Sequence, residues 1–416
     1  MEKRKLIVIG GGAAGMMAAL FASREGAAVS LLERNEKLGK KVYITGKGRC
    51  NVTNAADMDQ FMRRIYRNPR FLYAAFAKLD NRGLMELVES LGTPLKVERG
   101  DRVFPVSDKA SDIIFALQRG LQRENVDVRL NCRVRELLLE DGACRGVLLE
   151  DGSRLLADAV IVATGGLSYP TTGSTGDGYR FAEAAGHDIQ KPLPALTAIE
   201  TAESWPAKLM GLSLKNVSLT AWAAGGRKPK KLYSEQGELL FTHFGVSGPL
   251  ALTLSSLLPE DMGGIRLSID LKPALDEQTL DARLLRDFKA MSRKQLMTVM
   301  DGLAPHSLAE QLLALAGLSP SQSVNAVTAE QRGRLLRILK DLPLTPSGLR
   351  GFNEAIVTRG GVAVKGVNPS TMASKKVPNL YFAGEVLDVD AQTGGFNLQI
   401  AWSTGALAGS CAAREP

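Results

Sequence analysis

The sequence contains few of the residues that build metal sites and disulfide frameworks. Its 416 residues include four cysteines and three histidines. The cysteines are scattered and form no C-x-x-C pair, which argues against a structural zinc site, a dithiol redox pair or a disulfide framework. The histidines show no H-E-x-x-H spacing, so no catalytic metal is expected. We therefore expect an organic cofactor to supply the chemistry.

The sequence also lacks a long hydrophobic run. No segment reaches the ~18–20 apolar residues that would span a membrane. The opening MEKRK leads directly into an apolar strand pattern and not into a signal peptide. These features predict a cytoplasmic protein that does not insert into membranes. The length exceeds the usual size of one hydrophobic core, so two or three domains are expected.

Acidic residues are outnumbered by basic ones, and the net charge is +8. This excess favours anionic partners such as nucleotides or RNA. Two local runs contribute to it: Arg63, Arg64, Arg67 and Arg70, and Arg227, Lys228, Lys230 and Lys231. Each run is either a binding surface or an ordinary solvated face. The charge is spread along the chain, so no single domain is marked as the binding domain.

A glycine-rich strand–turn–helix pattern opens the chain. The apolar run 6–9 predicts a buried parallel strand. Gly10, Gly12 and Gly15 then fit G-x-G-x-x-G. The first glycine permits a tight turn, the second lets the backbone approach a pyrophosphate, and the third allows close helix packing. A helix is predicted to about Arg24. Its N-terminus offers N–H groups to phosphates.

A second strand is predicted at residues 29–32, and it ends at Glu33. An acid at this distance from the glycines accepts hydrogen bonds from a ribose. The unit therefore predicts dinucleotide binding, but it does not distinguish NAD from FAD.

Distant elements favour FAD. A strand at 157–164 precedes Gly165 and Gly166, and a late strand at 379–382 runs into Gly384 and Glu385. The segment 393–399 then opens a final helix whose N-terminus suits an anion or a flavin carbonyl. A nicotinamide dehydrogenase does not need this second element. No second G-x-G-x-x-G unit is present for NAD(P)H, which is therefore expected only as a transient reductant.

Several longer motifs carry a family resemblance. They lie at residues 8–15, 39–41, 45–54, 102–105, 163–170, 241–249, 384–388 and 394–399. The stretches T-G-x-G-R-C-N-x-T-N and T-H-x-G-x-S-G-P are the most specific. With these motifs the chain resembles the BaiN/RdsA family of NAD(P)/FAD-dependent oxidoreductases, also described as YhiN-like flavoproteins.

The resemblance implies an α/β architecture with three parts. A discontinuous Rossmann-like two-dinucleotide-fold FAD domain is expected at 1–191 and 351–416. A β-barrel-like insert is expected at 192–274, where short β-like runs alternate with turns. A small helical insert is expected at 275–350, where leucines recur at helical spacing.

The motifs and the resemblance together predict a set of FAD-binding residues. They are Gly10, Gly12, Ala13, Ala14, Gly15, Glu33, Arg34, Lys41, Gly46, Gly48, Arg49, Asn51, Val134, Thr164, Gly165, Gly166, Gly384, Glu385, Asp388, Gly395, Phe396, Asn397 and Leu398. Arg49 is expected to pair with a phosphate or a flavin carbonyl. Asn397 and Gln399 are expected either to contact flavin carbonyls or to hold the helix start.

Two residues are candidates for catalysis. Cys50 is either a general acid beside the flavin or a small residue packed beneath its ring. His243 either protonates or orients the substrate, or it has a structural role. The remaining cysteines are expected to be inert: Cys132, Cys144 and Cys411.

Members of the family have been linked to two reductions of a C=C bond. One converts uridine to dihydrouridine in large-subunit ribosomal RNA, and the other reduces ring double bonds of 3-oxo bile-acid intermediates. The resemblance and the positive charge together favour the RNA reaction. A small steroid-like enone is the alternative substrate, and a flavin-carrying RNA-binding or assembly module is the non-enzymatic alternative.

Overall fold

The computed structural model describes residues 3–224 and 229–414. It divides the chain into two compact units, which are described separately. The larger unit joins residues 1–195 to residues 351–416, and the smaller unit is residues 196–350. Two residues of the second basic run, Arg227 and Lys228, lie outside the described residues.

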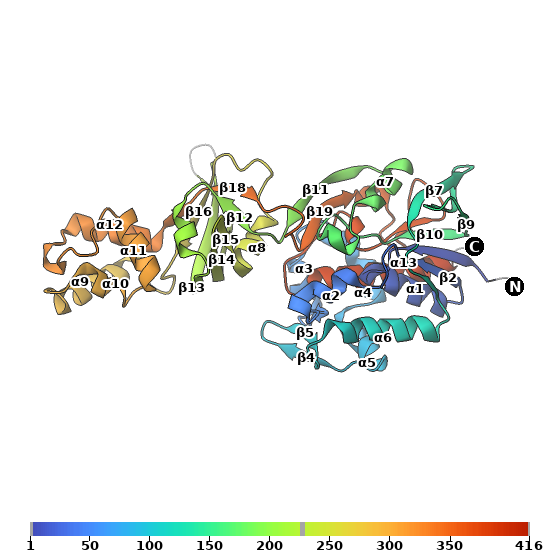
Figure 1. The fold of residues 1–416 in the computed structure, drawn as a ribbon, viewed down its shortest axis with the longest axis horizontal. Helices are drawn as coiled ribbons and strands as arrows, with labels where there is room; N and C mark the ends of the chain where they lie inside the picture. The colour runs from blue at the N-terminus through green and yellow to red at the C-terminus, as the bar shows by residue number, and fades with distance from the viewer. Residues whose placement is uncertain (1–2, 225–228, 415–416) are drawn as a thin grey trace. The chain divides into compact units, whose positions relative to one another are not determined.

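A five-stranded parallel sheet forms the centre of the larger unit (Figure 1). Its order is β20-β10-β1-β2-β6. The strands are β1 (Lys5–Ile9), β2 (Ala28–Leu32), β6 (Asp127–Arg129), β10 (Ala159–Val162) and β20 (Leu380–Phe382). All four residues of β10 are buried, as expected for a parallel strand covered on both faces. Because β20 pairs with β10, the last part of the chain completes the sheet begun by the first part.

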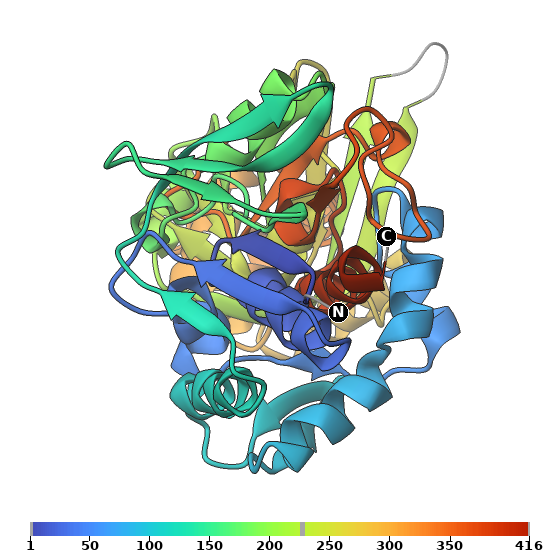
Figure 2. The same ribbon diagram turned by 90° about the vertical axis from the view of Figure 1, so that its right-hand side faces the viewer.

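Two helices pack closely against each other beside this sheet, α1 (Ala13–Arg24) and α13 (Phe396–Arg414) (Figures 1 and 2). A Cβ atom on Gly405 would lie 2.3 Å from the carbonyl oxygen of Ala14, and one on Gly409 would lie 2.1 Å from that of Ala18. Glycine at these positions therefore lets the two backbones touch. Since both residue pairs advance in the same direction, the two helices run the same way, with the start of α1 beside the middle of α13.

Smaller elements surround the sheet. The helices are α2 (Lys40–Ile44), α3 (Met58–Arg63), α4 (Tyr73–Lys78), α5 (Asn81–Ser90), α6 (Ala110–Arg123) and α7 (Asp177–Ala184), with short 3-10 turns that include η2 (Pro69–Leu72) and η7 (Gly384–Val386). The antiparallel groups are β3 (Thr53–Asn54), β5 (Arg102–Pro105) and β4 (Leu95–Glu98); β7 (Val134–Glu140), β8 (Ala143–Leu149) and β9 (Arg154–Leu156); and β11 (Ile189–Ala195) with β19 (Val357–Val362).

The smaller unit combines a seven-stranded antiparallel sheet with helices. The strand order is β17-β16-β13-β14-β15-β12-β18. The strands are β12 (Ile199–Thr201), β13 (Ser213–Ala223), β14 (Lys230–Thr242), β15 (Gly245–Ser247), β16 (Ile265–Asp270), β17 (Leu342–Leu344) and β18 (Pro346–Leu349). The helices are α8 (Gly248–Ser255), α9 (Glu277–Ala290), α10 (Leu296–Met300), α11 (His306–Leu315) and α12 (Ala329–Lys340).

One hydrophobic cluster spans the sheet and the helices of the smaller unit. It includes Leu219 and Leu267 of the sheet together with Leu284 and Leu312 of the helices. The sheet-rich and helical inserts that the sequence treats as separate therefore share a core. The unit begins at residue 196 and ends at residue 350.

Candidate cofactor site

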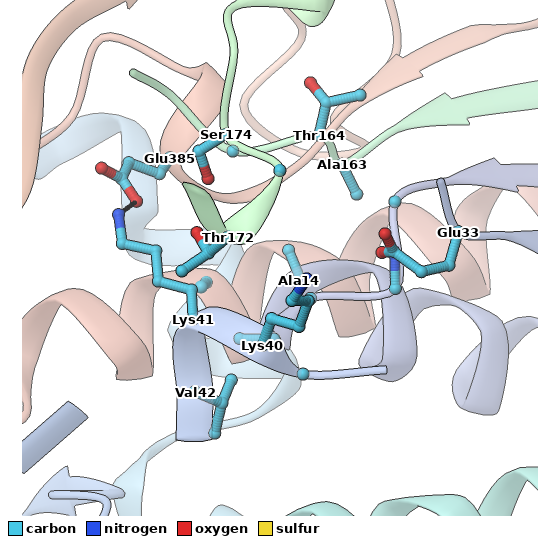
Figure 3. A pocket seen from close by; sticks show the side chains of 18 of the residues that line it. Ala14, Glu33, Lys40, Lys41, Val42, Ala163, Thr164, Thr172, Ser174 and Glu385 are labelled. Carbon is cyan, nitrogen blue, oxygen red and sulfur yellow. Dashed lines mark hydrogen bonds and ion pairs between the residues drawn. The ribbon is translucent and has the colours of Figure 1, made fainter. Parts of the chain in front are cut away.

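A cavity in the larger unit collects many of the residues that the motifs single out (Figure 3). Its walls come from the loop between β1 and α1, the end of β2, the start of α2, the loops that follow β10, and the start of α13. The expected FAD-binding residues that line it are Gly10, Gly12, Ala13, Ala14, Glu33, Arg34, Lys41, Val134, Thr164, Gly165, Glu385, Asn397 and Leu398. Residues far apart in the sequence thus meet around one space.

The turn before α1 has the geometry of a phosphate cradle. Gly10 has a φ of +103°, and a Cβ there would lie 2.7 Å from the carbonyl oxygen of Ala163. A Cβ on Gly15 would lie 1.7 Å from the carbonyl oxygen of Gly10, so α1 contacts the turn directly. Gly12 precedes the helix without a capping side chain. The first N–H groups of α1 are therefore directed toward the cavity, where an anion can accept from them.

Glu33 closes one end of the cavity. Its side chain is 7% exposed. One carboxylate oxygen accepts from the backbone N–H of Gly11 at 2.7 Å, and the other accepts from the backbone and side chain of Asn35 at 2.8 and 2.6 Å. Asn35 also donates to the carbonyl of Thr172 at 3.0 Å, which ties the Gly173 loop to this end. These bonds fix the Glu33 side chain where its oxygens can accept a hydrogen bond from a ribose hydroxyl.

Lys41 and Glu385 meet at the other end of the cavity (Figure 3). The Lys41 Nζ atom lies 2.6 Å from a Glu385 oxygen and 2.5 Å from the Ser168 hydroxyl. Ser168 donates to the second Glu385 oxygen at 2.7 Å, and the Thr358 N–H donates to it at 2.8 Å. Glu385 thus joins α2, the loop after β10, and β19. The network holds an ammonium group at the wall of the cavity.

The start of α13 supplies backbone rather than side-chain polarity. Gly394 and Gly395 have φ values of +121° and +99°. The Asn397 side chain accepts from the N–H of Ala391 at 2.9 Å and donates to its carbonyl at 2.8 Å. Asn397 therefore holds the loop that leads into the helix. Gln399 is fully buried and bonded to Thr53 at 2.7 Å, so it also holds the helix start.

Other predicted residues lie outside the lining of the cavity. They are Gly15, Gly46, Gly48, Arg49, Cys50, Asn51, Gly166, Gly384, Asp388, Gly395, Phe396 and His243. Some of them shape its walls from behind. A Cβ on Gly384 would lie 2.6 Å from that of Ala14, and one on Gly166 would lie 2.5 Å from the Thr358 hydroxyl. These glycines allow the segments that form the cavity to approach one another.

Arg49 is bound to acidic side chains. Its guanidinium bonds Glu98 and lies 2.8 Å from Asp108, and it stacks 4.1 Å from the centroid of the Phe104 ring. The partner expected from the sequence was a phosphate or a flavin carbonyl. In the structure the charge is instead compensated by Glu98 and Asp108.

The two candidate catalytic residues lie in different units. Cys50 is fully buried in the larger unit, and burial raises the pKa of its thiol to about 12. The thiol therefore stays protonated at neutral pH. His243 is exposed in the smaller unit, with its ring edge-on to Phe244 at 4.8 Å.

Two buried carboxyl groups follow Glu385. Asp388 and Asp390 are 6% and 1% exposed, and neither oxygen of Asp390 has a hydrogen-bond partner in the described part of the chain. Arg67 lies 3.5 Å from Asp388 and 3.3 Å from Asp390. Burial raises the pKa of Asp388 and raises that of Asp390 to about 7, although Arg67 opposes both shifts. Asn68 donates to the Asp388 carboxylate at 3.3 Å and to the Asp388 carbonyl at 2.7 Å, so hydrogen bonds also hold this cluster.

Several residues that line the cavity were not among the predicted cofactor-binding residues. Cys132, expected to be inert, lines the cavity next to Val134. The loop Thr172–Ser174 and Asp177 at the start of α7 also line it. Asp177 binds Arg34 at 3.1 Å. The glycine-rich stretch 171–178 just before a helix was a usable signal for this loop.

The residues around the cavity fit a flavin dinucleotide. A glycine cradle and a helix N-terminus suit a pyrophosphate, and Glu33 suits a ribose. The buried Thr164 hydroxyl lines the cavity without a hydrogen-bond partner among the described residues, so a polar group is free to bond there. The described residues contain no group of three His, Cys, Asp or Glu side chains arranged for a metal ion. No helix within residues 3–224 and 229–414 is long and apolar enough to cross a membrane.

Comparison with known proteins extends this picture to the whole chain. Residues 4–411 match the family described as "HI0933-like protein Rossmann domain". The chain is 32% identical over 415 residues to the 3-dehydro-bile acid delta(4,6)-reductase of Clostridium scindens, covering 98% of this chain and 99% of that protein. It is 32% identical over 411 residues to the ribosomal RNA dihydrouridine synthase of Escherichia coli, covering 97% and 96%.

A solved structure has the same general fold. The 3-ketosteroid delta1-dehydrogenase of Sterolibacterium denitrificans, in complex with 1,4-androstadiene-3,17-dione, matches with a TM-score of 0.52 and 14% identity. The match covers 99% of this chain and 100% of that chain.

Proposed function

The chain belongs to the HI0933-like family and is an FAD-dependent oxidoreductase, and from this premise we propose that it reduces uridine to dihydrouridine in ribosomal RNA. The observation that carries the proposal is the similarity to the Escherichia coli synthase, which extends over 97% of this chain. The relative from Haemophilus influenzae with the same name is 30% identical over 402 residues. The cofactor cavity and the net charge of +8 support the same conclusion.

In this proposal the residues of the cavity bind and orient FAD. The turn Gly10–Gly12 and the first N–H groups of α1 hold the pyrophosphate, and Glu33 holds the adenosine ribose. Lys41, fixed by Glu385, places a positive charge at the opposite end of the cavity. These residues would hold FAD, which when bound would supply the hydride transfer from NAD(P)H to the C=C bond. A cation at that end stabilises negative charge that builds up during the transfer.

The reduction also needs a proton on the neighbouring carbon. For Cys50 we propose the packing role, because its thiol is fully buried and does not line the cavity. His243, a residue of the smaller unit, stays the predicted proton donor, because an imidazole side chain can donate a proton in general acid catalysis. We expect His243→Asn to lower dihydrouridine formation by about 10²-fold or more with FAD content unchanged. A variant with wild-type turnover would remove His243 from the mechanism.

The decisive experiment is a deletion of the gene followed by mapping of dihydrouridine in large-subunit ribosomal RNA. The deletion strain should lose one or more dihydrouridines, and the wild-type gene should restore them. Complementation with Cys50→Ala should also restore them if the thiol only packs. Unchanged dihydrouridine in the deletion strain would rule out the RNA function.

A second candidate function is reduction of a small steroid-like enone. It is favoured by the Clostridium scindens relative, which has the same percentage identity over 98% of this chain. The two functions differ in substrate size and charge. The purified protein would bind a 3-oxo-4-ene steroid with little dependence on salt, whereas RNA binding weakens steeply as salt is added. A non-enzymatic RNA-binding module would bind RNA but leave NAD(P)H unoxidised in its presence.

A further inference from the structure

The first basic run of the chain divides into two pairs with different surroundings. It begins at the end of α3 and continues to η2. Arg64 donates to the side chain of Gln392 at 2.8 Å, and Arg67 forms the ion pairs with Asp388 and Asp390. These two arginines face the chain that leads into α13. Arg64 is exposed despite this bond, and the other two arginines of the run, Arg63 and Arg70, are exposed as well.

Arg63 and Arg70 have no acidic partner among residues 3–224 and 229–414. No carboxylate oxygen there lies within ion-pair distance of either guanidinium, although Asp59 precedes Arg63 by one helical turn. An exposed arginine without a counter-charge keeps its five N–H donors for a ligand. The pair therefore differs from Arg49, whose guanidinium is bound by two acids.

Backbone contacts attach this segment to the border of the cofactor cavity. The N–H groups of Tyr66 and Arg67 donate to the carbonyl of Asp390 at 2.9 and 3.3 Å. Ile65 forms a β-bridge with Ala391. The segment 388–392 contains Val389, which lines the cavity, and leads toward Asn397, which also lines it. The exposed arginines are thus fixed beside the chain that forms the cavity wall.

A second exposed arginine position is attached to the same border. Asn54 donates to the carbonyl of Gly100 at 3.0 Å and to that of Gly394 at 3.1 Å. Together these two bonds hold the tip of the β4–β5 hairpin near the turn that begins α13. The elements are labelled in Figure 1. Arg99 lies at that tip, is exposed, and has no acidic partner in the part of the chain that the structure describes.

We propose that Arg63, Arg70 and Arg99, here called the basic border, bind the phosphate backbone of the RNA and deliver one base to the cofactor cavity. This inference rests on the proposed function and adds the surface that recognises the substrate. Guanidinium groups bind phosphate oxygens in pairs of hydrogen bonds. Their rigid attachment to residues 388–394 fixes the distance from phosphate to reaction site.

An aromatic side chain adds a stacking surface. Tyr73 begins α4 directly after η2, and it is 60% exposed. Proteins that take hold of unpaired RNA bases combine arginines with aromatic rings on which bases stack. A large exposed tyrosine three residues from Arg70 therefore fits a single-stranded or looped RNA. The exposed Tyr73 ring would not contribute comparably to the binding of a small enone.

The test compares the FAD-loaded wild type with Arg63→Gln/Arg70→Gln and with a matched control, Arg293→Gln/Lys294→Gln. The control removes two exposed basic residues of the smaller unit. Preparations are matched for FAD content by absorbance. The Kd for large-subunit ribosomal RNA from the deletion strain is measured at several KCl concentrations, together with dihydrouridine formed in that RNA.

We expect the Arg63/Arg70 variant to bind RNA roughly tenfold more weakly, with the magnitude of the salt slope reduced by about 1.5–2, while the control behaves as wild type. Dihydrouridine formation at low RNA concentration should fall in parallel and recover at saturating RNA. Wild-type affinity and slope in the variant would overturn the basic border while leaving the proposed function intact. Altered RNA binding with no dihydrouridine from any protein would instead refute the proposed function and leave the border as an RNA site.

Discussion

Replacement of Asp390 by asparagine should make the larger unit more stable at alkaline pH. The carboxyl group is 1% exposed, and neither oxygen accepts a hydrogen bond from the described residues. Its pKa is raised to about 7 because burial disfavours the charged form more than Arg67 and Arg359 favour it. The folded protein therefore holds a proton on this group at pH values where the unfolded chain has released it.

The sign follows from proton linkage. The unfolded group titrates near 3.8, and the folded group near 7. Between these values the folded state binds more protons, so the free energy of unfolding falls as the pH rises and then levels off above pH 7. A shift of about three units corresponds to roughly 4 kcal/mol at most. Because Arg67 is 42% exposed and water can reach the pair, we expect about half of that, roughly 2 kcal/mol.

Asp390→Asn removes this titration. At pH 4.5 the wild-type group is neutral when folded, so the two proteins should unfold at similar temperatures. At pH 8 the variant should unfold about 4–8 °C higher than the wild type, since 1 kcal/mol shifts Tm by roughly 2–4 °C in a unit of this size. The rise in flavin fluorescence on heating reports unfolding of the unit that carries the cofactor cavity.

An exposed acid on α3 provides the matched control. Asp59→Asn should unfold at the same temperature as the wild type at both pH values, because the side chain of Asp59 is exposed. The reasoning would be refuted if Asp390→Asn lowered Tm more at pH 8 than at pH 4.5. That result would mean that the attraction of Arg67 and Arg359 outweighs the cost of burying the charge.

Three further predictions concern the cavity. Gly15→Ala should abolish FAD binding and disturb the near-UV circular dichroism spectrum, because its Cβ would lie 1.7 Å from a carbonyl oxygen. Gly12→Ala should keep the native spectrum, because no atom lies within 4 Å of its Cβ. Equal spectra for the two variants would contradict this prediction. Glu33→Gln should raise the Kd for FAD about tenfold in a fluorescence titration, because charged hydrogen bonds are lost; an unchanged Kd would remove its ribose role. Bound FAD should protect Cys132, which lines the cavity, from alkylation by iodoacetamide at pH 8.5. Cys50 is fully buried and should stay unlabelled with or without FAD. Peptide mass spectrometry measures the labelling of both cysteines.

The sequence by itself determined the local elements and the cofactor. The first strand, turn and helix follow from a β-branched run, three glycines and the acid Glu33, and the structure has β1, α1 and β2 at those positions. The long motifs determined the family, which the match over residues 4–411 confirms. These features could be predicted because each depends on residues close together in the chain, where backbone geometry and periodicity act directly.

The tertiary structure alone decided which side chains meet. In the folded protein Arg49 binds Glu98 and Asp108, and Cys132 lies at the cavity. Lys41 forms a hydrogen bond with Glu385, which is 344 residues away in the sequence. It also merged the sheet and helices of residues 196–350 into one core. Periodicity shows that a residue lies on a buried or exposed face, but not which partner arrives from a distant segment. That choice is made by packing of the whole unit, because charge compensation and burial depend on neighbours that are remote in sequence.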